Sequence, residues 1–354
     1  MKLNLKLFPD KNRPNSVLLI YTGGTIGMKA DPVDGTLKPF DFSGILEEVP
    51  ELRKFALKID SYTFNPIIDS SDVEPSLWQA LATLIRDRYD DYDGFVVLHG
   101  TDTMAYSASA LSFMLENLGK PVIFTGSQLP IGMLRTDGKE NLIDSLELAA
   151  ACDAHGHPYV SEVCIYFENE LFRGNRTTKY SAENFSAFRS PNYPPLAEVG
   201  THIRYNNQAL YHPSRWGLPL LMHTQLDNRV AVLKIFPGIS EAYVRAVLAT
   251  EGLRAVVLET FGSGNAPSYP WFLQALSDFT AAGGIVVNIT QCQTGMVDMG
   301  AYANGDTLRQ AGVVCGRDMT TEAAVTKLFV LLGQYSDNKT VAIKLEISSF
   351  GEIS

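Results

Sequence analysis

The chain has 354 residues, which is long for one domain and sufficient for two. Hydrophobic residues make up 45% of it and charged residues 19%, as in a globular protein with a buried core. With 29 basic and 39 acidic residues the formal net charge is −10, which disfavours nucleic acid and anionic membrane surfaces as partners. No segment reaches the roughly 18 apolar residues that a membrane-spanning helix requires.

The cysteines and the first residues bear on the location of the protein. The four cysteines lie far apart, at Cys152, Cys164, Cys292 and Cys315, and form no C-x-x-C pair. Reduced thiols are therefore expected rather than disulfides or a zinc site. The opening stretch MKLNLKLFPDKNRPNS lacks the apolar segment of about 7–15 residues that is typical of a signal peptide. We expect a cytoplasmic protein.

Along the first half, apolar strand-like runs alternate with segments of helical periodicity, the pattern of a mostly parallel sheet covered by helices. Pro75 suits the first turn of a helix, and Gly119 suits the end of one. The expected strands are Val17–Tyr21, a region around Tyr62–Phe64, Phe95–Leu98, Val122–Thr125 and Val163–Phe167, and the expected helices are Pro75–Tyr89, Met104–Leu118 and Asn141–Ala151.

Periodicity is lost from Arg173 to about Asn228, where prolines and asparagines accumulate. The alternation then resumes with expected strands at Val230–Phe236, Ala255–Thr260 and Ile285–Thr290 and expected helices at Ser240–Thr250, Trp271–Ala282 and Thr321–Leu332. We therefore predict two α/β domains with mostly parallel central sheets, the first of them larger and doubly wound. The predicted N-terminal catalytic domain covers 1–205, the linker 206–228 and the smaller C-terminal domain 229–354.

Small polar residues follow the predicted strands. Ligands of open parallel sheets bind beyond the carboxyl ends of the strands. The segments at these ends are Thr22–Gly27, Ile68–Asp72, His99–Thr103, Thr125–Gln128, Phe261–Asn265 and Thr290–Gln293. Their hydroxyl, carboxylate and amide groups suit recognition of a small polar molecule through many hydrogen bonds.

Nucleotide and metal sites are both disfavoured. The segment YTGGTIG (21–27) lacks the lysine of a phosphate-binding P-loop and does not match the G-x-G-x-x-G dinucleotide motif. His155 and His157 lie in a loop without an acidic cluster nearby, so they are expected to be solvated loop residues.

The threonines of these loops offer a different chemistry. A threonine hydroxyl is a weak nucleophile that needs an activating neighbour. Thr25 and Thr101 fall on two of the loops, Asp102 follows Thr101 directly, and the segment RGNRTTK (173–179) offers Lys179. Hydroxyl nucleophiles in a sequence that shows no Ser-His-Asp triad indicate amide or ester hydrolysis. The alternative is that TGGT forms only a tight turn and GTDT only a helix cap.

Two of these motifs carry a family resemblance. YTGGTIGM near the N-terminus and the segment DGFVVLHGTDTMAYSASALSFMLENLGKPVIFTGSQLP (93–130) closely resemble the bacterial-type L-asparaginase family. The segments RGNRTTK, PGIS (237–240), GSGNAP (262–267) and NITQC (288–292) are most similar to its cytoplasmic type I branch. The resemblance runs from about residue 16 to about residue 335.

The resemblance implies hydrolysis of L-asparagine through a threonine-linked β-aspartyl intermediate, with no cofactor and no metal. It implies that Thr25 is the nucleophile, that Thr101, Asp102 and Lys179 form a second catalytic set, and that Asp102 also binds the substrate ammonium. The remaining implied substrate-binding residues are Gly24, Asp69, Ser70, Ser71 and Asn265, the last supplied by a neighbouring subunit. The implied assembly is a homotetramer built from intimate dimers.

The chain departs from the family pattern at two places. Many members carry a tyrosine in the loop after the first motif, whereas residues 31–40 here offer Thr36 and no tyrosine. Tyr21 lies on the wrong side of the motif to replace it. Glu259 stands where cooperative type I enzymes carry a positive residue, so we expect allosteric activation by asparagine to be weak or absent. A strongly sigmoidal rate curve would contradict this expectation.

Three other functions remain open on the sequence. Glutamine differs from asparagine by one methylene, which a pocket discriminates by only about 1–3 kcal/mol, so a glutaminase-asparaginase of broader specificity is an alternative. An amidotransferase subunit acting on transfer RNA shares the motifs. That subunit carries an additional N-terminal domain, whereas TGGTIG starts near residue 22 here, and the acidic net charge also disfavours an RNA partner. A catalytically silent amino-acid sensor on the same fold is the binding-class alternative, which retention of all four catalytic positions disfavours.

Overall fold

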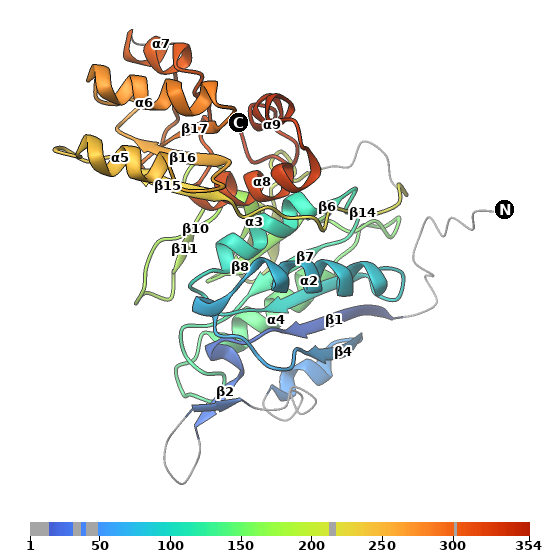
Figure 1. Ribbon diagram of the computed structural model, residues 1–354. Coiled ribbons are helices and arrows are strands. Elements are labelled where there is room, and N and C mark those ends of the chain that lie inside the picture. The colour runs from blue at the N-terminus through green and yellow to red at the C-terminus, as the bar shows by residue number, and fades with distance from the viewer. Residues whose placement is uncertain (1–13, 31–36, 40–48, 212–216, 301–302) are drawn as a thin grey trace. The chain divides into compact units, whose positions relative to one another are not determined.

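The computed structural model describes residues 14–30, 37–39, 49–211, 217–300 and 303–354 (Figure 1). The chain divides into two compact units. The first contains Met1–Ser190 and Pro194–Met222, and the second contains Pro191–Tyr193 and His223–Ser354. In the described part of the chain, none of the helices combines the length and apolar character that a bilayer crossing requires.

The first unit is built on an eight-stranded sheet with the order β13-β12-β9-β8-β7-β5-β1-β4. Its strands are β1 (Asn15–Tyr21), β4 (Leu57–Thr63), β5 (Gly94–Leu98), β7 (Val122–Thr125), β8 (Val163–Phe167), β9 (Glu170–Arg173), β12 (Ala197–Val199) and β13 (Ile203–Tyr205). The five strands from β4 to β8 in this order are parallel, and β9, β12 and β13 extend the sheet in antiparallel fashion. Every residue of β5, β7 and β8 is buried, as expected of strands covered on both faces.

The strand order places a topological switch at β1. The chain leaves β1 for β4 on one side and then crosses to β5 on the other side. Ligands of doubly wound sheets bind at such a point, beyond the carboxyl ends of the two strands that flank it. The fold therefore predicts a ligand site at the loops that follow β1 and β5.

In the described part of this unit, the helices that accompany the sheet are α2 (Pro75–Asp87), α3 (Met104–Met114) and α4 (Gly138–Ala150). In α2 the buried side chains are Leu77, Trp78, Leu81, Ala82 and Ile85, which recur at helical spacing along one face. The prediction that the helix from Met104 continues to Leu118 is wrong. Residues Leu115–Glu116 form β6, which pairs with β14 (Leu221–Met222), and Asn117 has a φ of 62°, outside the helical region.

The segment after Arg173 contains more regular structure than its lack of periodicity indicates. Besides β12, β13 and β14 it includes β10 (Thr178–Lys179), paired with β11 (Phe188–Arg189). Strands of two or three residues are too short to show an alternating pattern. The two-stranded pair β2 (Met28–Ala30) and β3 (Leu37–Pro39) follows the first loop.

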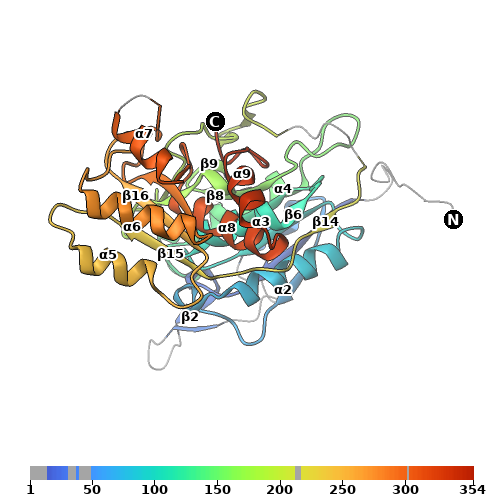
Figure 2. The ribbon, with the colours of Figure 1, turned by 45° about the horizontal axis from the view of Figure 1, so that its top comes forward.

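The second unit is a parallel four-stranded sheet with the order β15-β16-β17-β18. Its strands are β15 (Val230–Lys234), β16 (Ala255–Thr260), β17 (Ile285–Thr290) and β18 (Val314–Cys315), and its helices are α5 (Glu241–Leu248), α6 (Pro270–Ala281), α7 (Ala303–Gln310), α8 (Thr321–Gln334) and α9 (Asn338–Leu345). Helices α5, α6 and α7 lie side by side, and α8 packs against β15 and β16 (Figures 1 and 2). The predicted fold class, two α/β domains with mostly parallel sheets, is confirmed.

Candidate active site

The two threonine loops lie at the switch point of the first sheet. Thr22, directly after β1, donates its hydroxyl to the carbonyl of Leu98 at the end of β5, with an O–O distance of 2.9 Å. Its hydroxyl is therefore committed to holding the two strand ends together. Thr25 begins a short 3-10 helix, η1 (Thr25–Gly27), and is half-buried. Within the described residues the Thr25 hydroxyl has no hydrogen-bond partner, so it is free to react.

Glycines allow three loops to meet at the backbone. Gly24 has a φ of +95°, and a Cβ there would lie 2.6 Å from both the Cα and the nitrogen of Gly100. A Cβ on Gly100 would in turn lie 2.5 Å from the Oγ of Ser70. Real side-chain carbons do not approach this closely, so only glycine fits at either position. The loops after β1, β4 and β5 are thereby brought into direct contact.

The loop after β4 carries the expected substrate-binding serines. Asp69 caps the 3-10 helix η4 (Ser70–Asp72), accepting from the Ser71 N–H at 2.9 Å and from the Ser71 hydroxyl at 2.8 Å. The Ser71 N–H holds the pKa of the Asp69 carboxyl below its usual value. Thr103 ties this loop to the one after β5 by donating its hydroxyl to the Ser70 carbonyl at 2.6 Å. Asp69 therefore orders the turn, and Ser71 is exposed at its surface.

Lys179, Thr101 and Asp102 come together as a set. Lys179 lies on β10, and its Nζ is 2.9 Å from the Thr101 hydroxyl and 2.6 Å from Oδ1 of Asp102. The Lys179 side chain is 19% exposed and that of Asp102 63%. The lysine is distant in sequence from the other two, and the pairing of β10 with Phe188–Arg189 fixes the strand from which it extends.

Gln128 is a member of the site that the motifs alone did not single out. The Thr101 hydroxyl donates to its Oε1 over 3.4 Å, and its Nε2 donates to the carbonyls of Ala182 and Asn184 at 3.3 and 3.1 Å. Because those carbonyls can only accept, the amide is oriented with its oxygen toward Thr101. Asp137 holds the loop by accepting from the Gln128 N–H at 2.9 Å. The sequence feature that could have identified Gln128 as a site residue is its position just beyond the carboxyl end of β7.

Tyr21 has a structural role in the first loop. Its phenol donates to the Gly24 carbonyl at 3.3 Å, its ring packs against Gly27, and it is 1% exposed. Burial raises its pKa to about 12, so it does not serve as a base at neutral pH. Thr36, the residue considered in place of the missing tyrosine, lies outside the described residues.

Two residues of interest lie in the second unit. Asn265 closes the loop after β16, where its N–H and carbonyl bond reciprocally with Phe261 at 2.8 and 2.9 Å. Glu259 is 8% exposed; its carboxylate accepts from the Thr321 hydroxyl at 2.6 Å and lies 3.3 Å from the Lys234 Nζ. The Glu259 carboxylate is thus already partnered by a hydroxyl and an ammonium group.

The histidine loop and the described acidic groups show no metal-binding arrangement. His155 and His157 donate their backbone N–H groups to Asp153 at 2.8 and 2.9 Å. Among the residues that the structure describes, no group of three His, Cys, Asp or Glu side chains is placed to hold a metal ion.

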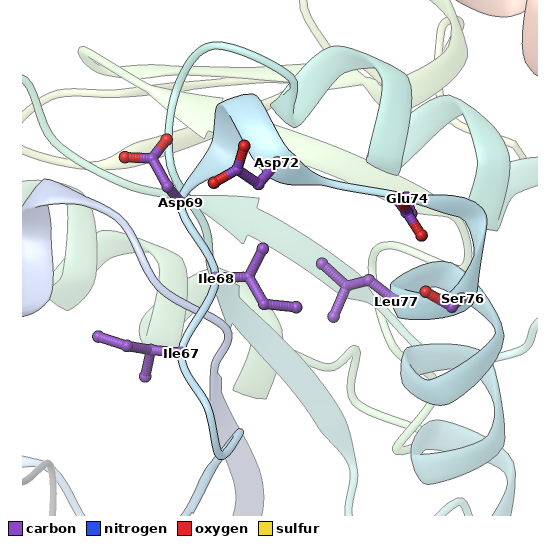
Figure 3. Close-up of a pocket in the computed structure, with 7 residues that line it drawn as sticks. All are labelled: Ile67, Ile68, Asp69, Asp72, Glu74, Ser76 and Leu77. Atoms are coloured by element: carbon purple, nitrogen blue, oxygen red, sulfur yellow. The ribbon is translucent and has the colours of Figure 1, made fainter.

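A pocket of about 330 Å³ lies beside the Asp69 loop and is lined by Ile67, Ile68, Asp69, Asp72, Glu74, Ser76 and Leu77 (Figure 3). Ile68 and Leu77 point toward each other, and the Asp69 carboxylate points away from them (Figure 3). With three carboxylates and no basic residue in its lining, the pocket is unsuited to the carboxylate of an amino acid. The threonine loops do not line it.

The combination of these features defines a class of protein. An α/β fold that presents a threonine hydroxyl without a partner among the described residues, on the loop next to that of a lysine-bonded threonine, suits an enzyme that transfers acyl groups through a hydroxyl nucleophile. The family model "Asparaginase, N-terminal" matches residues 16–211, and "Glutaminase/Asparaginase C-terminal domain" matches residues 229–343. The chain belongs to the asparaginase family, as the resemblance of its motifs predicted.

Individual relatives agree with this assignment. The chain is 46% identical to L-asparaginase 1 of Escherichia coli K12 over 96% of its own length and 98% of that protein. It is 44% identical to the human 60 kDa lysophospholipase, covering 90% of this chain and 58% of that protein. The crystal structure of L-asparaginase I from Vibrio cholerae superimposes with a TM-score of 0.88 at 42% identity, covering 96% and 99% of the two chains.

Proposed function

We propose that the protein hydrolyses the side-chain amide of L-asparagine, giving L-aspartate and ammonia. The observation that carries the proposal is the Lys179 ammonium, which bonds both the Thr101 hydroxyl and the Asp102 carboxylate beside the turn that presents Thr25. The similarity of the chain, over nearly its full length, to an L-asparaginase supports the same activity.

Acylation begins at Thr25. Its oxygen attacks the side-chain amide carbon, and the oxygen of that amide becomes negatively charged. Backbone N–H groups are suited to stabilise this charge, each worth about 2.7–4 kcal/mol. The N–H groups of Thr25 and Thr101 have no partner within the described residues and serve as candidates. The carbon–nitrogen bond then breaks, the nitrogen takes up the proton that the Thr25 hydroxyl has lost and leaves as ammonia, and a β-aspartyl ester remains on Thr25.

Hydrolysis of this ester uses the second set. A water molecule held by the Thr101 hydroxyl attacks the ester carbon, and its proton is relayed through Thr101 toward the Thr25 oxygen, while Lys179 fixes the position of the Thr101 hydroxyl. The bond between the carbon and the Thr25 oxygen then breaks, and Thr25 regains a proton as aspartate is released. Because Lys179 also bonds Asp102, the lysine is held in place throughout both steps.

The α-ammonium of the substrate is recognised by an opposite charge and its α-carboxylate by hydrogen-bond donors. Asp102 binds the α-ammonium; its Oδ1 contacts Lys179, while Oδ2 has no partner within the described residues. Ser70 and Ser71 bind the α-carboxylate, the Ser71 hydroxyl exchanging its bond to Asp69 for one to the substrate, and Gly24 and Asp69 complete the wall of this substrate site. This arrangement supplies one anion for the ammonium and several donors for the carboxylate.

We also propose a cytoplasmic homotetramer in which intimate dimers share their active sites. Asn265 of one subunit completes the site of its neighbour. Free thiols at all four cysteine positions fit a reducing compartment.

Ammonia release tests the function. Wild-type protein is expected to release ammonia from asparagine, and Thr25→Ala and Thr101→Ala to lose at least about 10³-fold in kcat. Full activity of Thr25→Ala would show that another residue is the nucleophile. Equal rates with glutamine would favour the glutaminase-asparaginase, and aspartate binding without turnover would favour the sensor.

A further inference from the structure

A buried histidine lies beneath the catalytic loop. His99 directly follows β5, is 1% exposed and packs edge-on against the ring of Phe124. Burial lowers its pKa to about 4, so the ring is neutral at physiological pH. None of the steps of asparagine hydrolysis described above uses it.

The hydrogen bonds of His99 have fixed directions. Its Nδ1 lies 2.7 Å from the Gly100 carbonyl, which can only accept, so Nδ1 carries the proton. Its Nε2 lies 2.9 Å from the Ser107 hydroxyl on α3. That hydroxyl accepts from the indole N–H of Trp78 on α2 at 2.9 Å, so it donates to Nε2. The chain of donors therefore runs in one direction from Trp78 through Ser107 and His99 to Gly100.

The peptide at the end of this chain is the contact point of the three loops. Gly100 packs against the backbone of Gly24 on one side and against the side chain of Ser70 on another. In a trans peptide the C=O and the following N–H point to opposite sides. Because the Gly100 carbonyl is held toward the buried imidazole, the Thr101 N–H points away from the core, and it has no partner within the described residues.

We propose that His99 is a positioning residue that fixes the Gly100–Thr101 peptide and thereby aims the Thr101 N–H at the substrate. The inference rests on the proposed function for its catalytic consequence, whereas the tautomer and the peptide orientation do not depend on it. The imidazole acts through hydrogen bonding alone and exchanges no proton during turnover.

Two substitutions separate this role from simple core packing. The amide nitrogen of asparagine takes the place of Nδ1, whereas that of glutamine reaches the place of Nε2. His99→Asn keeps the donor to Gly100 and is expected to lose less than about tenfold in kcat, whereas His99→Gln loses about 10²-fold or more. KM changes little in both, since the residues that bind the two ends of the substrate are untouched. Equal losses of kcat in the two variants would overturn the proposal.

A serine on the same helix supplies the control. Ser107→Ala interrupts the donor chain and is expected to lower kcat. Ser112→Ala removes a buried hydroxyl that donates to the Ala108 carbonyl, and should leave kcat unchanged. If both serine variants have the same kcat at equal Tm, the donor chain does not position the loop.

A readout independent of activity is the nitrogen-15 NMR spectrum of the histidines, with His99 assigned from the spectrum of His99→Gln. The expected signal is a neutral ring protonated on Nδ1 throughout pH 5–8. A ring protonated on Nε2, or one that titrates near its usual 6.5, would refute the proposal. If the wild type releases no ammonia but shows the expected tautomer, the proposed function fails and the positioning of the loop stands.

Discussion

Hydroxyl groups around the site differ in what they already bind. Thr22 and Thr103 donate to main-chain carbonyls at 2.9 and 2.6 Å and so join neighbouring loops. Thr101 receives a hydrogen bond from Lys179 and donates only a long one of 3.4 Å to Gln128, and Thr25 has no partner in the described part of the chain. A hydroxyl committed to a carbonyl must lose that bond before it can react, so Thr25 and Thr101 are the better candidates for chemistry.

The buried His99 predicts a pH dependence of stability. Its pKa is about 4 in the folded protein and near 6.5 when unfolded, so between these values only the unfolded chain binds the proton. Stability therefore falls as the pH drops from about 6.5 toward 4, by up to about 1.4 kcal/mol per pH unit from this group. Urea unfolding at pH 7 and pH 5 should show a smaller change for His99→Asn than for the wild type. An identical change in both would contradict the prediction.

Substitution of Gln128 is expected to slow catalysis although its side chain bonds Thr101 and not the nucleophile Thr25. Gln128→Leu removes the acceptor of the Thr101 hydroxyl and the two donors to Ala182 and Asn184. A lost hydrogen bond of about 1–1.5 kcal/mol corresponds to roughly a tenfold fall in kcat, measured by ammonia release. Gln274→Leu, which removes an exposed amide bonded to Asp278 on α6, is the control and should retain the wild-type rate. Unchanged kcat in Gln128→Leu would rule out this role.

Individual site residues were predictable to different extents. The strand ends and the family motifs identified Thr101, Asp102 and Lys179, which the structure brings together. Gln128 was missed as a site residue because its role depends on the orientation of its amide, which carbonyls at 182 and 184 determine. His99 was missed because burial and a directional donor chain are properties of packing, and a lone histidine in sequence reveals neither.

Among the elements, α8 is fastened to the last residues of the chain by a buried ion pair. The Lys327 Nζ lies 2.6 Å from Oε1 of Glu352, and the two side chains are 2% and 0% exposed. Lys327 also donates to the carbonyls of Leu345 and Ile347, and Glu352 accepts from the N–H groups of Ser349 and Phe350. The remaining donors and acceptors of the pair are thus satisfied, which offsets the desolvation of both charges.

Breaking this pair should destabilise the protein strongly. Lys327→Met leaves the Glu352 carboxylate buried without its cation and is expected to cost about 3–5 kcal/mol in urea unfolding. The double variant K327M/E352Q should recover part of that loss. Arg245→Ala, which breaks an exposed pair with Glu241 on α5, should cost no more than about 0.5 kcal/mol. A loss for Lys327→Met as small as this control would show that the pair adds little.

Element prediction succeeded where burial leaves a strong sequence pattern. The strands Val122–Thr125, Ala255–Thr260 and Ile285–Thr290 have the predicted bounds, because continuous apolar runs ended by polar residues mark fully buried strands. The pair β10–β11 was missed because strands of two residues show no pattern, and the pair β6–β14 was missed because its two strands also lie far apart in the chain. Helix α7 was missed because its sequence, ANGDTLRQ, contains a single large apolar residue and so lacks an apolar stripe like that of α2.

For the whole molecule, the sharing of active sites between subunits remains a prediction. Thr25 belongs to the first unit and Asn265 to the second. If Asn265 serves a neighbouring subunit, mixing inactive Thr25→Ala with impaired Asn265→Ala should regenerate activity, because each hybrid dimer contains one site with both residues intact. Random exchange would restore about a quarter of the sites. Mass spectrometry would show whether the subunits have exchanged. If they have, and ammonia release stays at the level of the separate variants, Asn265 does not complete the active site of a neighbouring subunit.

The contact between Gly24 and Gly100 also limits how such an enzyme can be altered in the laboratory. Saturation libraries at these two positions should return only glycine, since any larger residue separates the loops that carry both threonines. Changes of substrate preference must therefore come from positions at the periphery that tolerate new side chains, such as the exposed Ser71. The reacting centre thus requires two residues without side chains, and substitutions that change substrate preference are confined to exposed positions around it.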